Sequence, residues 1–125
     1  MRLKITSAFP QSGAVRIRVH TTKKEVFPVR LRIPSWSAAT RVAVNGQAYK
    51  AIPGGYLEIK RSWRDGDEII VWLDMRSRIL EAPHGSNRNE DPFRALQVGP
   101  LVLERDENQD PHYNEPVSIV SHKAL

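Results

Sequence analysis

Hydrophobic and polar residues alternate one by one along much of the chain, which is the pattern of β-strands that bury one face. In residues 29–33, VRLRI, the three aliphatic side chains take one face and the two arginines take the other. The same alternation predicts strands at residues 14–20, 41–44, 57–60, 75–80 and 95–98. Residues 69–73, IIVWL, contain no polar residue. They therefore predict a central strand covered on both faces, with Trp72 in the core.

Turn-forming residues separate these stretches. Asn45-Gly46 is the dipeptide that best accepts the positive φ angles of a type I′ hairpin turn. Residues 53–55, PGG, and residues 64–67, RDGD, mark two further turns. Gly99-Pro100 lies between residues 95–98 and residues 101–103, which predicts two short strands or one bent strand.

No stretch shows the apolar spacing of a helix, and eight or nine short strands are separated by turns. Parallel strands need long crossovers, so the pattern predicts an all-β fold, an antiparallel two-sheet β-sandwich of jelly-roll-like type. At 14.2 kDa, folding buries about two-thirds of the unfolded chain's surface, enough for one core. We predict a β-sandwich domain over residues 1–110, with a long surface loop at residues 81–92. Residues 111–125 are predicted as a polar tail, in which Val117–Val120 is a last short strand or a frayed end.

The chain carries a formal net charge of +5 and has a pI near 9.9, values that invite a nucleic-acid partner. Its basic residues, however, are spread over separate strands, and no aromatic RNA-binding motif accompanies them. Alternating pairs of arginines occur at Arg16 and Arg18, Arg30 and Arg32, and Arg76 and Arg78. Such faces are either solvated or docked on an acidic neighbouring domain, where the planar guanidinium fork is favoured. We predict no nucleic-acid partner and favour docking to another domain.

The sequence contains no cysteine, which excludes disulfides, thiolate metal sites and cysteine nucleophiles. No apolar stretch approaches the roughly 20 residues that span a bilayer, so no membrane partner is predicted. The first residues carry positive charge without a following apolar stretch, so no signal peptide is expected in this sequence. These features leave the cellular compartment open.

Candidate catalytic groups are few. Glycosidases use two carboxylates about 5 to 10 Å apart, and Glu81, Glu90 and Asp91 lie in or beside the predicted long loop. Loop carboxylates are normally solvated, so a catalytic pair is the less favoured interpretation. The four histidines lack the spacing of a zinc pair and are interpreted as surface residues: His20, His84, His112 and His122. We predict no catalytic residue, no metal site and no cofactor.

Exposed aromatic rings offer a second kind of site, because β-sandwich carbohydrate-binding modules stack sugars on such rings. The candidates for sugar stacking are Trp36, Trp63 and Tyr56. The competing interpretation is that the two tryptophans pack at the ends of strands over the edge of the core, with the indole N–H at the wet boundary with solvent.

Five short motifs occur in a fixed order: LRIPSW, VNG, GYLEIKRSWRDGDEI, a strand that contains Met75, and VGPLVLE. Together they resemble the C-terminal β-sandwich portion of glycoside hydrolase family 127, the β-L-arabinofuranosidase-like proteins, and cover about residues 14–104. The family pattern is roughly RIPSW, VNG, GY, W-x-x-GD, LPM and RGPLVY. This chain departs from it with LDM at residues 73–75, with Val98 in place of arginine, and with Phe9-Pro10 for a tyrosine-proline-tryptophan element.

The resemblance implies an (α/α)6-barrel catalytic domain N-terminal to this segment. It also implies that the catalytic carboxylate and a zinc-associated cysteine nucleophile lie in that barrel. None of these residues is carried over, since the chain has no cysteine and no barrel. The resemblance thus implies an accessory domain that is inactive alone.

Three hypotheses follow. The leading one is a noncatalytic sandwich that packs against and stabilises a glycoside hydrolase barrel. The second is a carbohydrate-binding module, which requires at least two exposed and roughly coplanar aromatic rings. The third is a self-contained hydrolase, which requires two close carboxylates in a cleft, one with a raised pKa.

Overall fold

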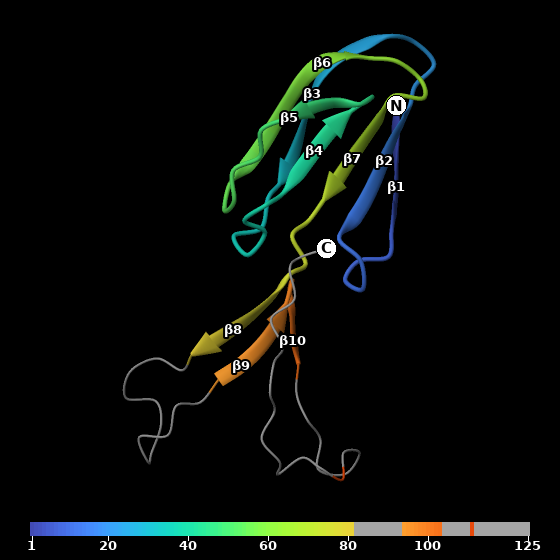
Figure 1. Cartoon of the computed structure of the whole chain (residues 1–125). Helices are drawn as coiled ribbons and strands as arrows, with labels where there is room; N and C mark the ends of the chain where they lie inside the picture. The colour runs from blue at the N-terminus through green and yellow to red at the C-terminus, as the bar shows by residue number, and fades with distance from the viewer. Residues whose placement is uncertain (82–93, 104–110, 112–125) are drawn as a thin grey trace. The chain divides into compact units, whose positions relative to one another are not determined.

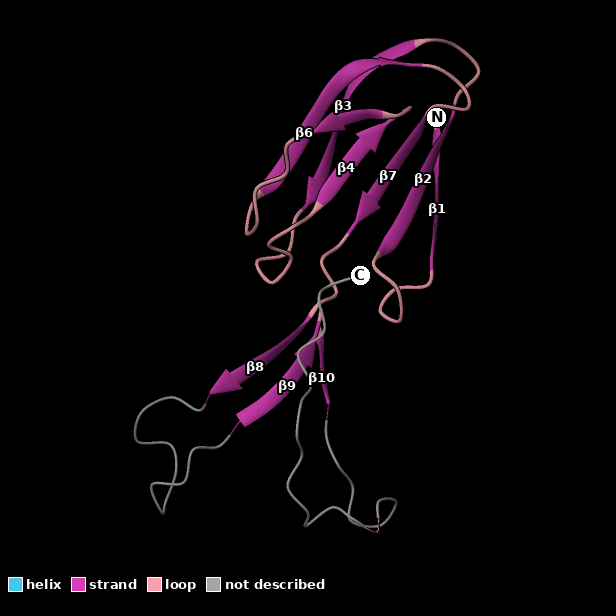
Figure 2. Ribbon diagram, in the orientation of Figure 1, coloured by secondary structure: helices cyan, strands magenta, loops and turns pink. Residues whose placement is uncertain are grey.

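The structure is a computed structural model that describes residues 1–81, 94–103 and 111. Within these residues the chain is all-β, without a helix, and every pair of neighbouring strands is antiparallel (Figures 1 and 2). The predicted fold class is confirmed. The chain divides into two compact units, residues 1–75 and residues 76–125, and this division was not predicted from the sequence.

The first unit contains two sheets. The large sheet has five strands in the order β1-β2-β7-β4-β5 (Figure 1). Their bounds are Arg2–Ser7 for β1, Ala14–His20 for β2, Glu68–Trp72 for β7, Arg41–Val44 for β4 and Gln47–Tyr49 for β5. The small sheet pairs β3, Glu25–Arg32, with β6, Tyr56–Trp63.

The core of this unit combines hydrophobic side chains from both sheets with Ile33, which directly follows β3. The buried members are Ile17, Val19, Val29, Ile33, Val42, Val44, Ile59, Trp63, Ile69 and Val71. On β2, Ile17 and Val19 are buried while Arg16 and Arg18 are exposed, as the alternation predicts. The two sheets therefore form a sandwich that shares one hydrophobic interior.

The predicted turns have the expected backbone geometry. Asn45 and Gly46, with φ of 48° and 84°, join β4 to β5 by a two-residue hairpin. Gly54 and Gly66 also have positive φ, at 84° and 87°. Glycine accepts these angles without the steric cost that other residues incur.

The pairing of strands departs from a series of simple hairpins. Strand β7 lies between β2 and β4, and β3 pairs with β6, so long sequence separations are bridged. Strand β1 was not predicted, although Leu3 and Ile5 alternate with Arg2 and Lys4; in the structure it is an edge strand whose six residues are all exposed. Strand β3 begins at Glu25 rather than Val29 and includes Pro28, which pairs in register with Lys60.

The prediction that Trp72 lies in the core is wrong. In β7, Ile69 and Val71 point into the sandwich and are buried, so Ile70 and Trp72 point outward and are half-buried. The apolar run thus correctly predicted a central strand, but the outer face of that strand is covered only in part.

The second unit contains a three-stranded antiparallel sheet in the order β10-β9-β8. The strands are β8, Ser77–Glu81, β9, Arg94–Val98, and β10, Leu101–Leu103. Gly99, with φ of 56°, and Pro100 lie between two separate strands, which resolves the alternative of one bent strand.

Other predictions fall outside the described residues. These are the loop after Glu81, the last strand at Val117–Val120 and all of the tail except Pro111. The domain over residues 1–110 and the tail over residues 111–125 remain predictions.

Candidate functional site

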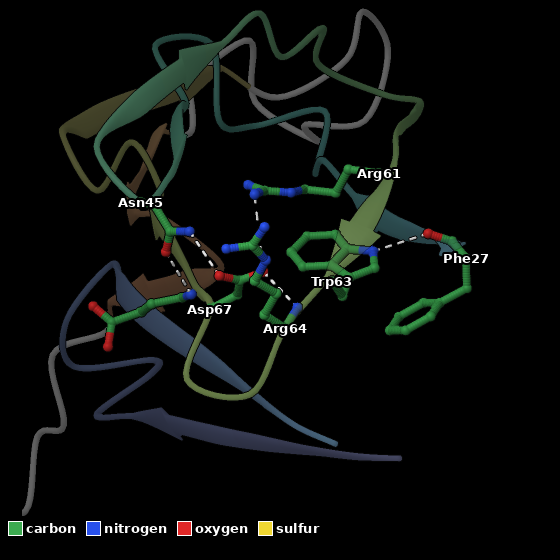
Figure 3. A network of polar contacts seen from close by, with 7 residues as sticks. Phe27, Asn45, Arg61, Trp63, Arg64 and Asp67 are labelled. Carbon is green, nitrogen blue, oxygen red and sulfur yellow. Dashed lines mark hydrogen bonds and ion pairs between the residues drawn. The ribbon is translucent and has the colours of Figure 1, made fainter. Parts of the chain in front are cut away.

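The structure separates the three aromatic residues proposed for sugar stacking. Trp63 is fully buried, with 0% of its surface exposed, so no sugar reaches its ring. Its indole N–H donates a hydrogen bond to the Phe27 carbonyl oxygen at 2.9 Å, and its ring stacks on that of Phe27 at 5.8 Å between centroids (Figure 3). For Trp63 the expectation of an N–H at a wet boundary is wrong, because the residue is fully buried and a backbone carbonyl of β3 accepts the hydrogen bond.

Trp36 lies in the loop after β3 and is half-buried. Its ring stacks on Phe9 with 6.4 Å between centroids and 12° between ring planes. Phe9, at 43% exposure, is the more accessible of the two rings. Trp36 therefore joins two loops of the first unit and leaves only part of its surface for a ligand.

Tyr56 is the exposed member of the set, with 61% of its surface accessible. It lies on the outer face of the small sheet, directly opposite Arg32 in the register of β3 and β6. The guanidinium carbons of Arg30 and Arg32 are 5.7 and 5.6 Å from the centre of its ring. Arg30 also forms an ion pair with Glu58 at 3.3 Å. We call these four residues, Arg30, Arg32, Tyr56 and Glu58, the Tyr56 cluster.

The outer face of the large sheet is a second candidate surface. The register places an apolar centre beside basic residues on this face: Arg2, Lys4, Arg16, Arg18, Arg41, Glu68, Ile70 and Trp72. We call this set the basic face. Arg16 and Arg18 share Glu68 at 3.6 and 3.8 Å, and the Arg41 guanidinium carbon lies 5.1 Å from the centre of the Trp72 ring.

Ile70 and Trp72, the apolar centre of the basic face, are half-buried. Exposed tryptophan and arginine are the residue types enriched in the centres of protein interfaces. Because the basic face has five cations and one carboxylate among its described residues, its chemistry suits an acidic partner.

The turn after Trp63 holds a network that the sequence did not reveal. Asp67 accepts hydrogen bonds from the Asn45 amide at 2.9 Å and from the Arg64 backbone N–H at 2.8 Å (Figure 3). Arg61 forms a long ion pair with Asp67 at 3.9 Å, and Asn45 also accepts a hydrogen bond from the Glu68 backbone N–H at 2.9 Å. These contacts tie the turn at residues 64–67 to the hairpin turn of β4 and β5.

Burial of Asp67 by itself raises the pKa of its carboxyl group. The hydrogen bonds from Arg64 and Asn45 and the charges of Arg61 and Arg64 outweigh burial, so the pKa of Asp67 lies below its usual value of 3.8. This carboxylate is saturated with structural partners, which makes it unsuited to proton transfer.

Ser37 is a buried polar residue that the sequence analysis overlooked. Its hydroxyl accepts a hydrogen bond from the Asp74 backbone N–H at 2.8 Å and contacts the Thr40 hydroxyl at 2.5 Å. Thr40 in turn donates to the Ser37 carbonyl oxygen at 2.6 Å. The group fixes the loop after β3 against the end of β7, which is a structural role.

The candidates for catalysis lie mostly outside the described residues. This holds for Glu90, Asp91, His84, His112 and His122 and for the side chain of Glu81. His20 is described and lies 3.6 Å from Asp65. Over the described parts of the chain, no cluster of three His, Asp or Glu residues could hold a metal ion. The same parts contain no helix long and apolar enough to cross a membrane.

The first unit is an antiparallel β-sandwich with two candidate surfaces, and no catalytic arrangement is found among the described residues. A family model described as "Beta-L-arabinofuranosidase, GH127 middle domain" matches residues 1–75, the first compact unit. That match covers more than half of the chain, so the chain belongs to the GH127 middle-domain family. The family describes this segment as a middle domain, so its predicted place in a C-terminal portion is not confirmed.

Solved structures support the assignment. One titled "Glycoside hydrolase" shares 31% identity with a TM-score of 0.70, over 80% of this chain and 17% of its own. Ara127N-Se, a GH127 β-L-arabinofuranosidase from Geobacillus stearothermophilus T6, shares 31% identity with a TM-score of 0.71. The match covers 80% of this chain and 16% of that one. The GH127 β-arabinofuranosidase BT3674 shares 29% identity with a TM-score of 0.71, and the match covers 80% of this chain and 18% of that one. This chain thus spans less than a fifth of each of these structures. No curated protein matches it significantly.

Proposed function

We propose that this chain is a noncatalytic accessory β-sandwich that packs against and stabilises the (α/α)6-barrel catalytic domain of a β-L-arabinofuranosidase-like glycoside hydrolase. The observation that carries the proposal is the basic face, where the outward side chains of β7, Ile70 and Trp72, remain half-exposed in the centre of a sheet. The matched structures are several times longer than this chain, which supports a further domain as the partner.

The absence of activity is tested by incubating the chain with aryl arabinofuranosides. The Geobacillus GH127 enzyme serves as the positive control. We expect no hydrolysis above a protein-free blank. Turnover by this chain would contradict the proposal and favour the self-contained hydrolase.

Docking is tested in a chimera in which this chain replaces the matching segment of the Geobacillus enzyme. Arg41→Glu reverses a charge on the basic face, whereas Lys60→Glu does so on the outer face of the small sheet and is the matched control. We expect Arg41→Glu to lower the melting temperature of the chimera more than that of the isolated chain, and Lys60→Glu to act equally on both. Equal effects of Arg41→Glu in the two proteins would contradict docking through this face.

Carbohydrate binding is a second candidate function, supported by the exposed ring of Tyr56. Trp63 is excluded from such a site by burial, so a sugar platform would be centred on Tyr56 rather than on the three residues together. This function does not require the basic face and is compatible with an accessory role.

A further inference from the structure

The Tyr56 cluster combines an exposed aromatic ring with cations whose hydrogen-bonding capacity is largely unused. A cation–π contact holds a guanidinium near the ring without consuming its N–H donors. Arg30 shares part of its charge with Glu58. Arg32 has no carboxylate within ion-pair distance among the residues that the structure describes, so its donor fork is available to a ligand.

The cluster is built on a rigid support. Eight consecutive residue pairs align β3 with β6, and they set Arg32 opposite Tyr56 and Arg30 opposite Glu58. On the other face of the same strands, Val29 and Ile59 are buried in the core. The spacing of the four outward side chains is thus fixed by the ladder, which lowers the entropic cost of binding a ligand.

We propose that the Tyr56 cluster binds a carboxylate-bearing sugar, the uronic-acid class of oligosaccharide. The part of the Tyr56 ring that Arg30 and Arg32 leave exposed would pack against the apolar face of the sugar, and Arg32 would hold its carboxylate through two parallel N–H···O bonds. Glu58 is an acceptor for sugar hydroxyl groups. An acidic peptide would use the arginines but not the flat face of the ring, which is why a sugar is favoured. This inference rests on the second candidate function above.

The test is a calorimetric titration of the whole chain with trigalacturonate and with its methyl ester, in which each carboxylate is neutralised. We expect the acid to bind about tenfold more tightly than the ester, which is the usual effect of one charge-assisted hydrogen-bonded pair. Arg32→Gln should remove that preference. Tyr56→Ala should weaken both ligands, and circular dichroism would verify that this surface variant is folded.

Two controls separate the cluster from the chain's general positive charge. Arg16→Gln removes a cation from the basic face and should leave binding of trigalacturonate unchanged. Trisaspartate presents carboxylates without a sugar ring and should bind more weakly than trigalacturonate.

Each other outcome overturns the inference in a distinguishable way. Equal binding of acid and ester would refute carboxylate recognition but retain carbohydrate binding. Failure of both sugars to bind would refute both. Equal losses with Arg16→Gln and Arg32→Gln, or trisaspartate binding as tightly as the sugar, would show that only charge is recognised. None of these results bears on docking through the basic face.

Discussion

Trp63 and Trp72 are the last residues of consecutive strands, β6 and β7, yet their surroundings are opposite. Trp63 points into the sandwich, where its N–H is bonded and its ring is stacked. Trp72 points outward and meets the Arg41 guanidinium. The run around Trp72 is the more hydrophobic of the two sequences, so local hydrophobicity did not decide which ring is buried. The parity of each position in its ladder did, because adjacent strand residues take opposite faces.

The largest effect that tests this comparison is expected from Trp63→Ala. It should lower the free energy of unfolding by about 3 to 5 kcal/mol, since it removes a fully buried ring with its hydrogen bond to the Phe27 carbonyl oxygen and leaves a cavity. Urea denaturation followed by circular dichroism measures the change. A midpoint close to wild type would mean that the core is misplaced.

The next effect concerns the end of β7, where the backbone of Leu73 contacts Gly13. A Cβ on Gly13 would lie 2.8 Å from the Met75 side chain and closer still to the Leu73 carbonyl oxygen, and the Leu73 N–H donates to the Gly13 carbonyl oxygen at 2.9 Å. Gly13→Ala should therefore cost about 1 to 3 kcal/mol. Gly55→Ala is the matched control, because a Cβ there meets its nearest atom at 4.0 Å. Similar denaturation midpoints for the two variants would contradict a tight contact at Gly13.

Trp72→Ala should have a smaller effect, a loss of about 1 to 2 kcal/mol, because the ring is only half-buried and contributes packing and a cation–π contact. The same urea experiment measures it beside Trp63→Ala. If the two alanine variants lose equal stability, then the outer face is covered as fully as the core and the contrast between the tryptophans fails.

The smallest effect is a dependence on pH in the turn after Trp63. The pKa of Asp67 is lower in the folded chain than the usual 3.8, so its ionised form contributes stability above that value and the contribution is lost as pH falls through the folded pKa. Asp67→Asn should therefore reduce stability at pH 7 and should lose less further stability than wild type when the pH is lowered to 3. Melting temperatures over this range test the difference.

Trp72→Ala is the control for this experiment, since it leaves the hydrogen bonds of Asp67 in place. It should retain the pH dependence of the wild type. An unchanged slope in Asp67→Asn would show that Asp67 does not contribute to acid sensitivity.

Much of the fold was accessible from local patterns. The alternation at residues 14–20 and the glycine turn at Asn45-Gly46 predicted strands and a hairpin that the structure contains. Strand β1 was missed although Leu3 and Ile5 alternate with Arg2 and Lys4, and in the structure this edge strand buries neither face. The partnership of β3 with β6 was equally hidden, since it joins strands separated by much of the sandwich sequence.

The candidate sites were only partly predictable. The sequence analysis singled out Arg30 and Arg32 as part of a docking face. It singled out Tyr56 separately, as a candidate for sugar stacking. Only the register of β3 and β6 places them in one cluster. The Asp67 network joins two turns, and no local signal relates Asn45 to Asp67 before the strands are paired.

The sequence by itself determined the all-β class, the positions of most strands and the turns that require positive φ, because these depend on neighbouring residues in the chain. Its family motifs also indicated the glycoside hydrolase family. The tertiary structure alone decided which tryptophan is buried, which arginines surround Tyr56 and where the compact first unit ends. Those outcomes depend on contacts between residues far apart in sequence, and the pairing of strands fixes them.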